Sequence, residues 1–375
     1  AGAGAGAGGA GGGAGADWKR AAPHRTAPPD SHSHHFPEAR QTNVKVMKQS
    51  IVTDDAGGYE GFETLDPSAM KEIDVLQDSQ VIRTVTWSTA PDSSMFVYGT
   101  TSRALKFAEA SAQRGISLLQ ELPDYHAGSI YAISWHRHGD LLATGSNDKQ
   151  VQVTKLTVER DGGFSHSTPV HLQGHTGTVR CVEWCDSLSP SCLLSAGAGD
   201  CAVRLWDFSR KSCLAMLQGH TDHIQALART HDSPRAATGG KDGQVRLWDL
   251  RQQASSRVLA CQGEEVLSLH FNPSETMLAA GFASSCCNVW ELRMGKVMHR
   301  FQHHQHQCRS VEYSPDGRWL VTASFDGTIA FVDVVDGSVA AILTGHEDRV
   351  VQARPHPQLP WTLSCSVDKT VRLWG

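Results

Sequence analysis

The sequence predicts an all-β fold in which seven copies of a unit of about 42 residues pack into a closed ring, preceded by a disordered N-terminal arm. Four tryptophans set the period, with spacings of 42, 42 and 84 residues: Trp206, Trp248, Trp290 and Trp374. Aspartates keep the same period, six residues before the residue that ends each hydrophobic run: Asp242, Asp326 and Asp368. Two residue types that share one period indicate a repeat architecture.

The composition excludes several classes of function. At 375 residues, 40% of them hydrophobic, the chain can bury the core of one large repeat domain. Its net charge of −5 argues against a nucleic-acid binder. No apolar run approaches the roughly 18 residues that cross a bilayer, so we expect a cytoplasmic protein without a membrane contact. The ten cysteines are expected to be reduced core residues, with Cys286 and Cys287 packing at a strand edge, and we expect no cofactor.

Residues 1–48 are predicted to form a disordered arm, and residues 49–68 a linker. Residues 1–16 are only glycine and alanine, which leaves no side chain to bury. Residues 17–48 contain four prolines and six Lys or Arg against three acids, so the arm carries about +3 and the remainder −8. Such an arm is either a solvated linker or a contact for an acidic partner such as tubulin. Its histidine cluster has no further ligand at fixed spacing and is not expected to bind metal.

The repeat domain is predicted to span residues 69–375. Each copy has a Gly-His turn, an inner strand, a second strand ending in small residues, a turn with Asp, and a third strand. Five copies keep the histidine and the aspartate: His126 with Asp148, His175 with Asp200, His220 with Asp242, His304 with Asp326, and His346 with Asp368. The first copy keeps only the strand rhythm, and the fifth keeps Trp290 but neither the histidine nor the aspartate. Short β-branched runs broken by Gly, Asn, Asp and Pro indicate antiparallel strands, and sheets of this kind must pack face to face to bury themselves.

The Gly-His, Asp and Trp-Asp pattern resembles the WD-repeat family, which implies a seven-bladed β-propeller with four strands per blade. In that family a histidine, a Ser or Thr, an aspartate and a tryptophan form a buried hydrogen-bond network. The resemblance places these residues in it: His175, Asp200, Trp206, His220, Thr238, Asp242, Trp248, His346, Ser364, Asp368 and Trp374. A Ser-His-Asp catalytic set is the alternative, but the same residue types recur in several copies, whereas an enzyme needs one site.

The resemblance also implies how the ring closes. The last copy ends at Gly375 with one strand too few, and the alternating segment MKEIDVLQ near residues 70–77 precedes the first copy. In the family an N-terminal strand completes the last blade, so this segment is the expected closing strand. The chain opens with Ala1 rather than Met, which leaves open that it is a piece of a longer protein.

Several phrases, among them LLSAGAGDC and TGGKDGQVRLWDLR, resemble the propellers of microtubule-associated WD-repeat proteins. The resemblance implies a non-catalytic scaffold that binds other proteins, in the cytoskeleton or the ciliary axoneme, with microtubule contact either direct or through another protein. If the narrow face of the propeller binds partners, the candidate residues lie five positions after the repeat histidines: Tyr131, Arg180, Gln225 and Arg309. Ordinary polar strand positions are the simpler interpretation of any one of them.

A second functional hypothesis comes from Trp248-Asp249-Leu250-Arg251, which resembles the WDxR motif of substrate receptors of cullin-type ubiquitin ligases. The candidate adaptor contacts are Trp248, Asp249 and Arg251. Two local features remain. The stretch from residue 155 to residue 170 is expected to be a long loop, because Asp148 and Asp200 are 52 residues apart. His304 is expected to be the repeat histidine of the sixth copy, with His303 and His306 exposed.

Overall fold

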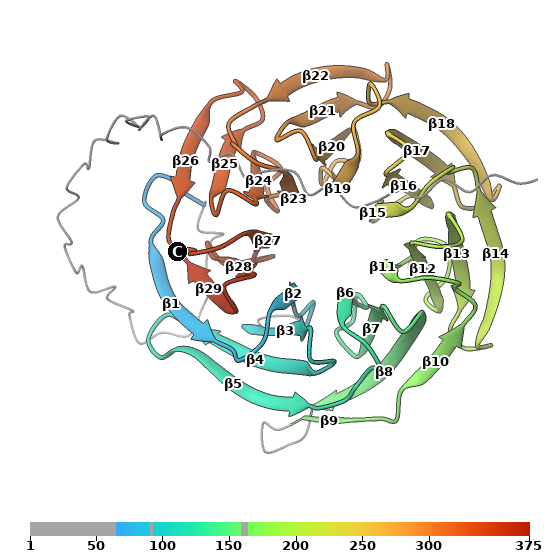
Figure 1. Ribbon diagram of the computed structural model, residues 1–375, viewed down its shortest axis with the longest axis horizontal. Helices are drawn as coiled ribbons and strands as arrows, with labels where there is room; N and C mark the ends of the chain where they lie inside the picture. Colours follow the sequence, from blue (N-terminus) through green and yellow to red (C-terminus); the bar gives the residue numbers. More distant parts are fainter. Residues whose placement is uncertain (1–64, 91–92, 159–163) are drawn as a thin grey trace, which may run out of the picture. The chain divides into compact units, whose positions relative to one another are not determined.

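The structure, a computed structural model, describes residues 65–90, 93–158 and 164–375. The predicted arm, residues 1–48, and the linker up to residue 64 lie outside the described residues. In the described ranges the regular elements are all β-strands (Figure 1). No helix in these ranges could cross a lipid bilayer. The strands form seven antiparallel sheets, six of them from consecutive strands and the seventh from β27, β28, β29 and β1, which confirms the predicted all-β ring of seven blades.

The first three blades follow the chain in order from the inner strand to the outer strand. Blade 1 contains β2 (Ile82–Trp87), β3 (Met95–Thr100), β4 (Leu105–Ser111) and β5 (Gly115–Leu122). Blade 2 contains β6 (Ile130–Trp135), β7 (Leu141–Ser146), β8 (Gln150–Val158) and β10 (Val170–Gln173), with β9 (Phe164–His166) paired to β8. Blade 3 contains β11 (Val179–Trp184), β12 (Cys192–Gly197), β13 (Ala202–Asp207) and β14 (Ser212–Gln218).

The remaining blades repeat this plan. Blade 4 contains β15 (Ile224–Arg229), β16 (Arg235–Gly240), β17 (Gln244–Asp249) and β18 (Ala254–Ala260). Blade 5 contains β19 (Val266–Phe271), β20 (Met277–Phe282), β21 (Cys287–Glu291) and β22 (Lys296–Phe301). Blade 6 contains β23 (Cys308–Tyr313), β24 (Trp319–Ser324), β25 (Ile329–Asp333) and β26 (Val339–Leu343). Blade 7 contains β27 (Val350–Pro355), β28 (Thr362–Ser366) and β29 (Thr370–Trp374), completed by β1 (Glu72–Gln77).

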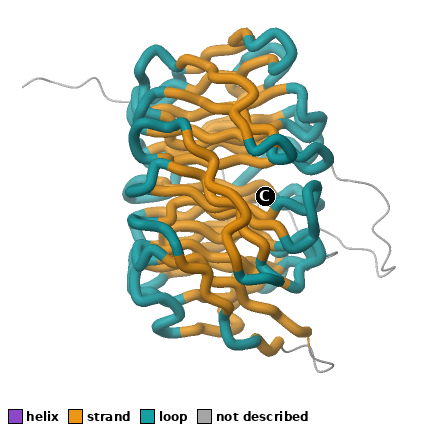
Figure 2. The backbone as a smooth tube through the Cα atoms, turned by 90° about the vertical axis from the view of Figure 1, so that its right-hand side faces the viewer, coloured by secondary structure: helices purple, strands orange, loops and turns teal. Residues whose placement is uncertain are grey.

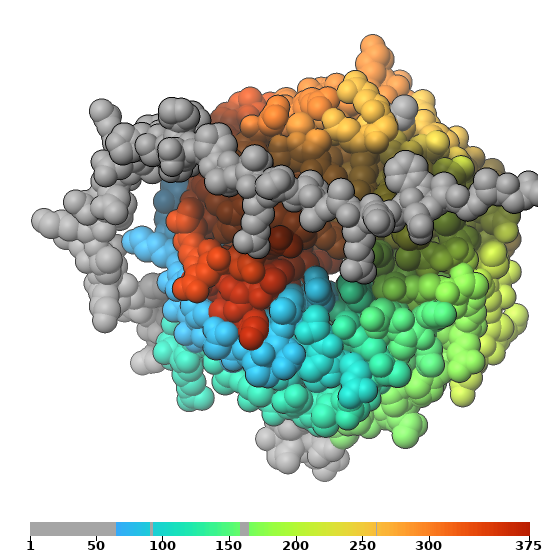
Figure 3. All heavy atoms as spheres, in the orientation of Figure 1, coloured from blue at the N-terminus to red at the C-terminus, as the bar shows by residue number. Residues whose placement is uncertain are grey.

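The two ends of the described chain meet in blade 7. Strand β1 runs antiparallel to β29, with Glu72 opposite Trp374 and Gln77 opposite Thr370. Figure 1 shows β1 in blue beside the red strands of blade 7, and Figure 3 shows the blades in contact around the ring in sequence order. Because β1 supplies the outer strand, blade 7 holds segments from both ends of the described chain, and the outer edge of β29 is not left unpaired.

The core lies between neighbouring blades. One cluster combines Val153 of blade 2 with Val179, Trp184 and Trp206 of blade 3, all of them buried. Eight of the ten cysteines are buried as free thiols: Cys181, Cys185, Cys192, Cys261, Cys286, Cys287, Cys308 and Cys365. The expectation that all ten lie in the core is wrong for Cys201, which is half-buried, and for Cys213, which is exposed. Figure 2 shows the strands as a central layer with loops on both sides. The blades thus form a rigid frame whose loops are held at two faces.

Every inner strand carries a β-bulge at its second residue. In blade 2, Ile130 pairs with Ser146 and Ala132 with Gly145, so Tyr131 has no partner residue of its own. The same shift occurs at the start of the six other inner strands. A bulge redirects the side chain of the extra residue, and this local geometry decides where the second residue of each inner strand points.

The expectation of a long loop from residue 155 to residue 170 is wrong in part. Strand β8 continues to Val158, and β9 returns along it, with Leu156 opposite His166. Residues 159–163, at the tip of this hairpin, lie outside the described residues. The extra length is therefore largely strand, because residues 164–166 can pair with the exposed edge of the lengthened β8.

Candidate protein-interaction site

A buried chain of hydrogen bonds holds the loops of blade 4. The indole Nε1 of Trp248 donates to Thr238 Oγ1 at 2.7 Å, and His220 Nε2 lies 2.8 Å from the same hydroxyl. His220 Nδ1 lies 2.8 Å from Asp242 Oδ2. Burial lowers the pKa of His220, against the opposing effect of Asp242, and this favours the neutral ring. A neutral His220 that donates from Nδ1 and accepts at Nε2 satisfies every member of the chain.

Blades 3 and 7 contain the same network with serine in place of threonine. His175 Nε2 lies 2.6 Å from Ser195 Oγ, and Trp206 Nε1 donates to that oxygen at 2.7 Å. His175 Nδ1 lies 3.1 Å from Asp200 Oδ2. In blade 7 the corresponding distances join four residues: His346 to Asp368 at 2.7 Å, His346 to Ser364 at 2.7 Å, and Trp374 to Ser364 at 2.8 Å.

Blades 2 and 6 build the network without tryptophan. His126 lies 2.8 Å from both Asp148 and Thr144. Here Tyr125 is packed beside the network, with its hydroxyl 2.5 Å from Thr154, the residue at the tryptophan position. In blade 6, His304 contacts Asp326 and Thr322, and His303 Nε2 also lies 2.8 Å from Thr322 Oγ1.

The expectation that His303 is exposed is therefore wrong. Its ring is half-buried against the network, and burial, with a further contribution from His304, lowers its pKa to about 4. His306 is exposed. Within the described ranges no group of three or more metal-ligating side chains converges.

Four of the network aspartates are held ionised by their hydrogen-bond partners. Burial raises the pKa of Asp368, but hydrogen bonds from His346 and Thr370 outweigh it and leave the pKa below its ordinary value. The same balance lowers the pKa of Asp148, Asp200 and Asp326. Most of these carboxylates also accept backbone N–H groups, as Asp368 does from Thr370 and Glu347, so the network fixes loop conformation. Repetition in five blades makes it a structural device, not one catalytic set.

Blade 1 replaces the histidine with an acid. Asp78 lies four residues before its inner strand, the place that histidine takes in five other blades. Its Oδ2 accepts hydrogen bonds from Lys106 Nζ at 2.8 Å and from the Tyr98 hydroxyl at 3.1 Å. Sequence reasoning missed Asp78 and Lys106, because neither belongs to the Gly-His and Asp pattern. Asp78 lies four residues before its inner strand, as each repeat histidine does, and this shared spacing is the signal that could have found it.

The four predicted partner-binding residues come together in one central cavity. Tyr131, Arg180, Gln225 and Arg309 are the bulge residues of β6, β11, β15 and β23, and all four are half-buried. The cavity has a volume of about 270 Å³ and is lined by inner-strand residues from all seven blades. Sequence reasoning missed Arg83, which occupies the bulge of β2 and lines the same cavity, because blade 1 has no repeat histidine to count from. We call the end lined by these bulge residues the channel mouth.

The other end of the cavity carries acids, and we call it the channel floor. It is formed by the fifth residues of the inner strands, among them Glu183, His270, Glu312 and Arg354. Glu312 lies 2.5 Å from Arg354 Nη1 and 3.1 Å from His270 Nε2. Burial raises the pKa of Glu312 to about 7, against the opposing effect of Arg354. The two ends of the channel therefore differ in charge.

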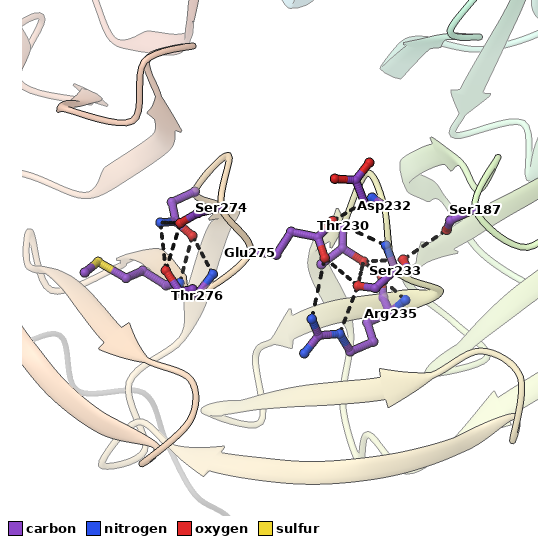
Figure 4. Close-up of polar contacts among 10 residues, drawn as sticks. Ser187, Thr230, Asp232, Ser233, Arg235, Ser274, Glu275 and Thr276 are labelled. Carbon is purple, nitrogen blue, oxygen red and sulfur yellow. Dashed lines mark hydrogen bonds and ion pairs between the residues drawn. The ribbon is translucent and has the colours of Figure 1, made fainter.

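A hydrogen-bonded series joins the turns of blades 3, 4 and 5 on the channel-floor side (Figure 4). Ser187 donates to the carbonyl oxygen of Ser233 at 3.0 Å, and Ser233 Oγ donates to Glu275 Oε2 at 2.5 Å. Glu275 Oε1 also accepts the backbone N–H of Asp232 at 2.6 Å. Because each blade is tied to the next, these turns present a fixed surface.

The WDxR-like residues divide between the core and the surface. Trp248 is buried in the network of blade 4. Asp249 Oδ1 accepts the backbone N–H groups of Arg251 at 2.9 Å and Gln252 at 3.1 Å, so its carboxylate shapes the turn after β17. Arg251 is exposed. Asp207 caps the corresponding turn of blade 3 in the same way.

Comparison with known families matches most of the repeats. The model described as WD domain, G-beta repeat, matches residues 117–154, 167–207, 211–249, 295–333 and 337–375, together more than half of the chain. A second model, the anaphase-promoting complex subunit 4 WD40 domain, matches residues 236–311. The first model leaves out residues 250–294, which contain most of blade 5, one of the two copies without the histidine and aspartate.

The similar curated proteins are diverse. The chain is 30% identical over 135 residues to Protein ALTERED SEED GERMINATION 2 of Arabidopsis thaliana, covering 33% of this chain and 17% of that protein. It is 26% identical over 152 residues to Transducin beta-like protein 3 of Rattus norvegicus, covering 40% and 18%. It is 26% identical over 116 residues to THO complex subunit 3 of Arabidopsis thaliana, covering 31% and 35%. The chain therefore matches between 17% and 35% of the length of these three relatives.

Proposed function

Because the chain belongs to the WD-repeat family, as the match over more than half of its length shows, we propose that it is a non-catalytic scaffold that binds other proteins at the channel mouth. The observation that carries the proposal is the convergence of Tyr131, Arg180, Gln225 and Arg309 on one cavity. Tyrosine and arginine are frequent in the energetic centres of interfaces. The frame behind them is rigid, so little ordering of the scaffold opposes binding.

The test uses the full chain in partner capture from cells. It compares a double variant at the channel mouth, Tyr131→Ala with Arg180→Gln, with the control Arg210→Gln. Arg180→Gln removes one charge at the channel mouth, and Arg210→Gln removes one from an exposed turn, where Arg210 lies 3.5 Å from Asp207. We expect crosslinked partners to be lost with Tyr131→Ala and Arg180→Gln together and to be retained with Arg210→Gln. Retention of every partner by the mouth variant, with unchanged thermal unfolding, would place binding on another surface.

We further propose a cytoskeletal setting, in the cytoplasm and at microtubules or the ciliary axoneme. The support is the resemblance of the repeat phrases to nemitin, a microtubule-associated WD-repeat protein. The residues after the predicted arm carry about −8, and tubulin is acidic too, so attachment through another protein or through the slightly basic arm is favoured. Proximity labelling in ciliated cells, with and without residues 1–48, tests this. Recovery of tubulin and axonemal proteins is expected, and their absence from both samples would reject the setting.

A second candidate function is substrate reception for a cullin-type ubiquitin ligase. The observation that favours it is the exposed Arg251, which the Asp249 carboxylate holds in a fixed turn. If this motif binds the ligase adaptor, Arg251→Ala will abolish coprecipitation of the cullin and its adaptor. Arg210→Ala, in the equivalent turn of blade 3, should leave it unchanged. Coprecipitation that is equal in both variants, or absent from the unaltered chain, would exclude this function.

A further inference from the structure

The arginines of the central channel fall into two groups. At the channel floor, Arg354 lies 2.5 Å from Glu312, and Arg229 lies 3.9 Å from Glu183. At the channel mouth stand three others: Arg83, Arg180 and Arg309. Across the described part of the chain, none of these three forms an ion pair with a carboxylate. The mouth therefore holds three positive charges that no ion pair among the described residues neutralises, although the Glu265 carboxylate accepts a hydrogen bond from Gln225 at the same mouth.

The three guanidinium groups are enclosed rather than solvated on the outer surface. Arg83 and Arg180 lie on two sides of Tyr131, with their Cζ atoms 5.8 Å and 5.7 Å from the centre of its ring. The Nε atoms of both arginines are buried and have no hydrogen-bond partner. Arg309 has one, because its Nη1 donates to the carbonyl oxygen of Leu267 at 2.9 Å. Much of the donor capacity of the cluster is thus unused.

The like charges also disfavour one another. Burial lowers the pKa of Arg309, and the neighbouring Arg180 and Arg83 lower it further. Holding three cations in a partly desolvated cavity costs free energy unless an anion joins them. An oxyanion matches these donors, since guanidinium groups bind carboxylates and phosphates through paired, charge-assisted hydrogen bonds.

The cavity limits what can carry this anion. A volume of about 270 Å³ accommodates a few side chains, not a folded domain. The floor offers no such surplus of positive charge, because Arg354 lies against Glu312 and Arg229 lies near Glu183. Two of the other bulge residues, Leu267 and Val351, are apolar and can contact the non-polar part of an inserted chain.

We propose that the channel mouth binds an oxyanion group, a carboxylate or a phosphate, on an extended acidic segment of a partner protein. Arg83, Arg180 and Arg309 supply the charge and the donors, and Tyr131 keeps two of the guanidinium groups oriented. This inference rests on the proposed scaffold function, for which it names the chemistry of the partner.

The experiment measures fluorescence anisotropy of labelled peptides with the full chain. Three peptides share one sequence and carry either three glutamates, three glutamines or one phosphoserine at its centre. We expect the glutamate or the phosphoserine peptide to bind and the glutamine peptide to bind at least tenfold more weakly. Tighter binding of the glutamate peptide indicates that the mouth takes a carboxylate. Tighter binding of the phosphoserine peptide, with displacement by inorganic phosphate, indicates that it takes a phosphate.

Variants then locate the binding. Arg180→Gln should weaken binding of the acidic peptide about tenfold, and Arg180→Lys less, whereas Arg210→Gln should leave it unchanged. Arg83→Gln provides a second mouth variant if Arg180→Gln fails to fold. Equal binding of the acidic and glutamine peptides, or acidic-peptide binding that both mouth variants retain, would overturn the proposal. If the peptides fail while protein partners are still lost with the mouth variants in cells, the scaffold function stands and the anionic chemistry is wrong.

Discussion

Lys106 and Asp78 form a buried ion pair in blade 1, with Nζ and Oδ2 separated by 2.8 Å and both residues no more than 8% exposed. Asp78 stands where five other blades have the histidine of their network. Its carboxylate also accepts from Tyr98, which lies at the Ser or Thr position of those networks. Blade 1 therefore ties its loop to its second and third strands with a different set of side chains.

Replacing Lys106 by methionine should destabilise the fold by about 3 kcal/mol, because it leaves the Asp78 carboxylate buried without its cation. Urea unfolding followed by tryptophan fluorescence measures the change. The exposed Lys296→Met on β22 is the matched control and should change stability by less than about 0.5 kcal/mol. Equal stability of Lys106→Met and the unaltered chain would mean that the pair does not contribute. The double variant Asp78→Asn with Lys106→Met should lose less than the two single losses added together.

Thr238→Val should destabilise blade 4 by about 3 kcal/mol, because it leaves Trp248 Nε1 and His220 Nε2 buried without their shared partner. Thr238→Ser is the control, since blades 3 and 7 use serine at this position. It should retain most of the stability and the protection of the Trp248 indole proton from hydrogen exchange. Stability that is retained in Thr238→Val but lost in Thr238→Ser would indicate that the methyl group, not the hydroxyl, is what matters.

The repeat period made the ring predictable, because each blade needs its own turn residues and its own hydrophobic strands at fixed steps. The order of strands within a blade could be read in advance from that period, and the partners of His220 and His346 followed from the resemblance to the WD-repeat family. The bulge could not, since one extra residue leaves no mark on the hydrophobic pattern. Arg83 and Asp78 were missed for a related reason. They take positions defined by geometry, while the sequence of blade 1 has lost the histidine and aspartate that mark those positions elsewhere.

Acid should destabilise the fold below about pH 4, through the network aspartates. Asp148, Asp200, Asp326 and Asp368 have pKa values below that of an unfolded aspartate, about 3.9. Their contribution is complete above the unfolded pKa and is lost as the pH falls through the folded pKa. Urea midpoints at pH 6, 4 and 3 should show this decline. Asp368→Asn should make the decline shallower, and the exposed Glu347→Gln should not. An identical slope in all three proteins would contradict the assignment.

Glu312 should give the opposite dependence in a higher pH window. Its pKa is raised from 4.5 to about 7, so the folded chain keeps a proton that the unfolded chain has already released. The contribution of Glu312 to stability should therefore fall by about 3 kcal/mol as the pH rises from about 4.5 to about 7. Glu312→Gln should remove this fall, although it lowers stability at every pH because Arg354 loses its partner. The readout is the slope of unfolding free energy against pH, with Glu121→Gln, on outer strand β5, as control. A slope that survives Glu312→Gln would show that other groups produce it and that Glu312 does not titrate in this pH window.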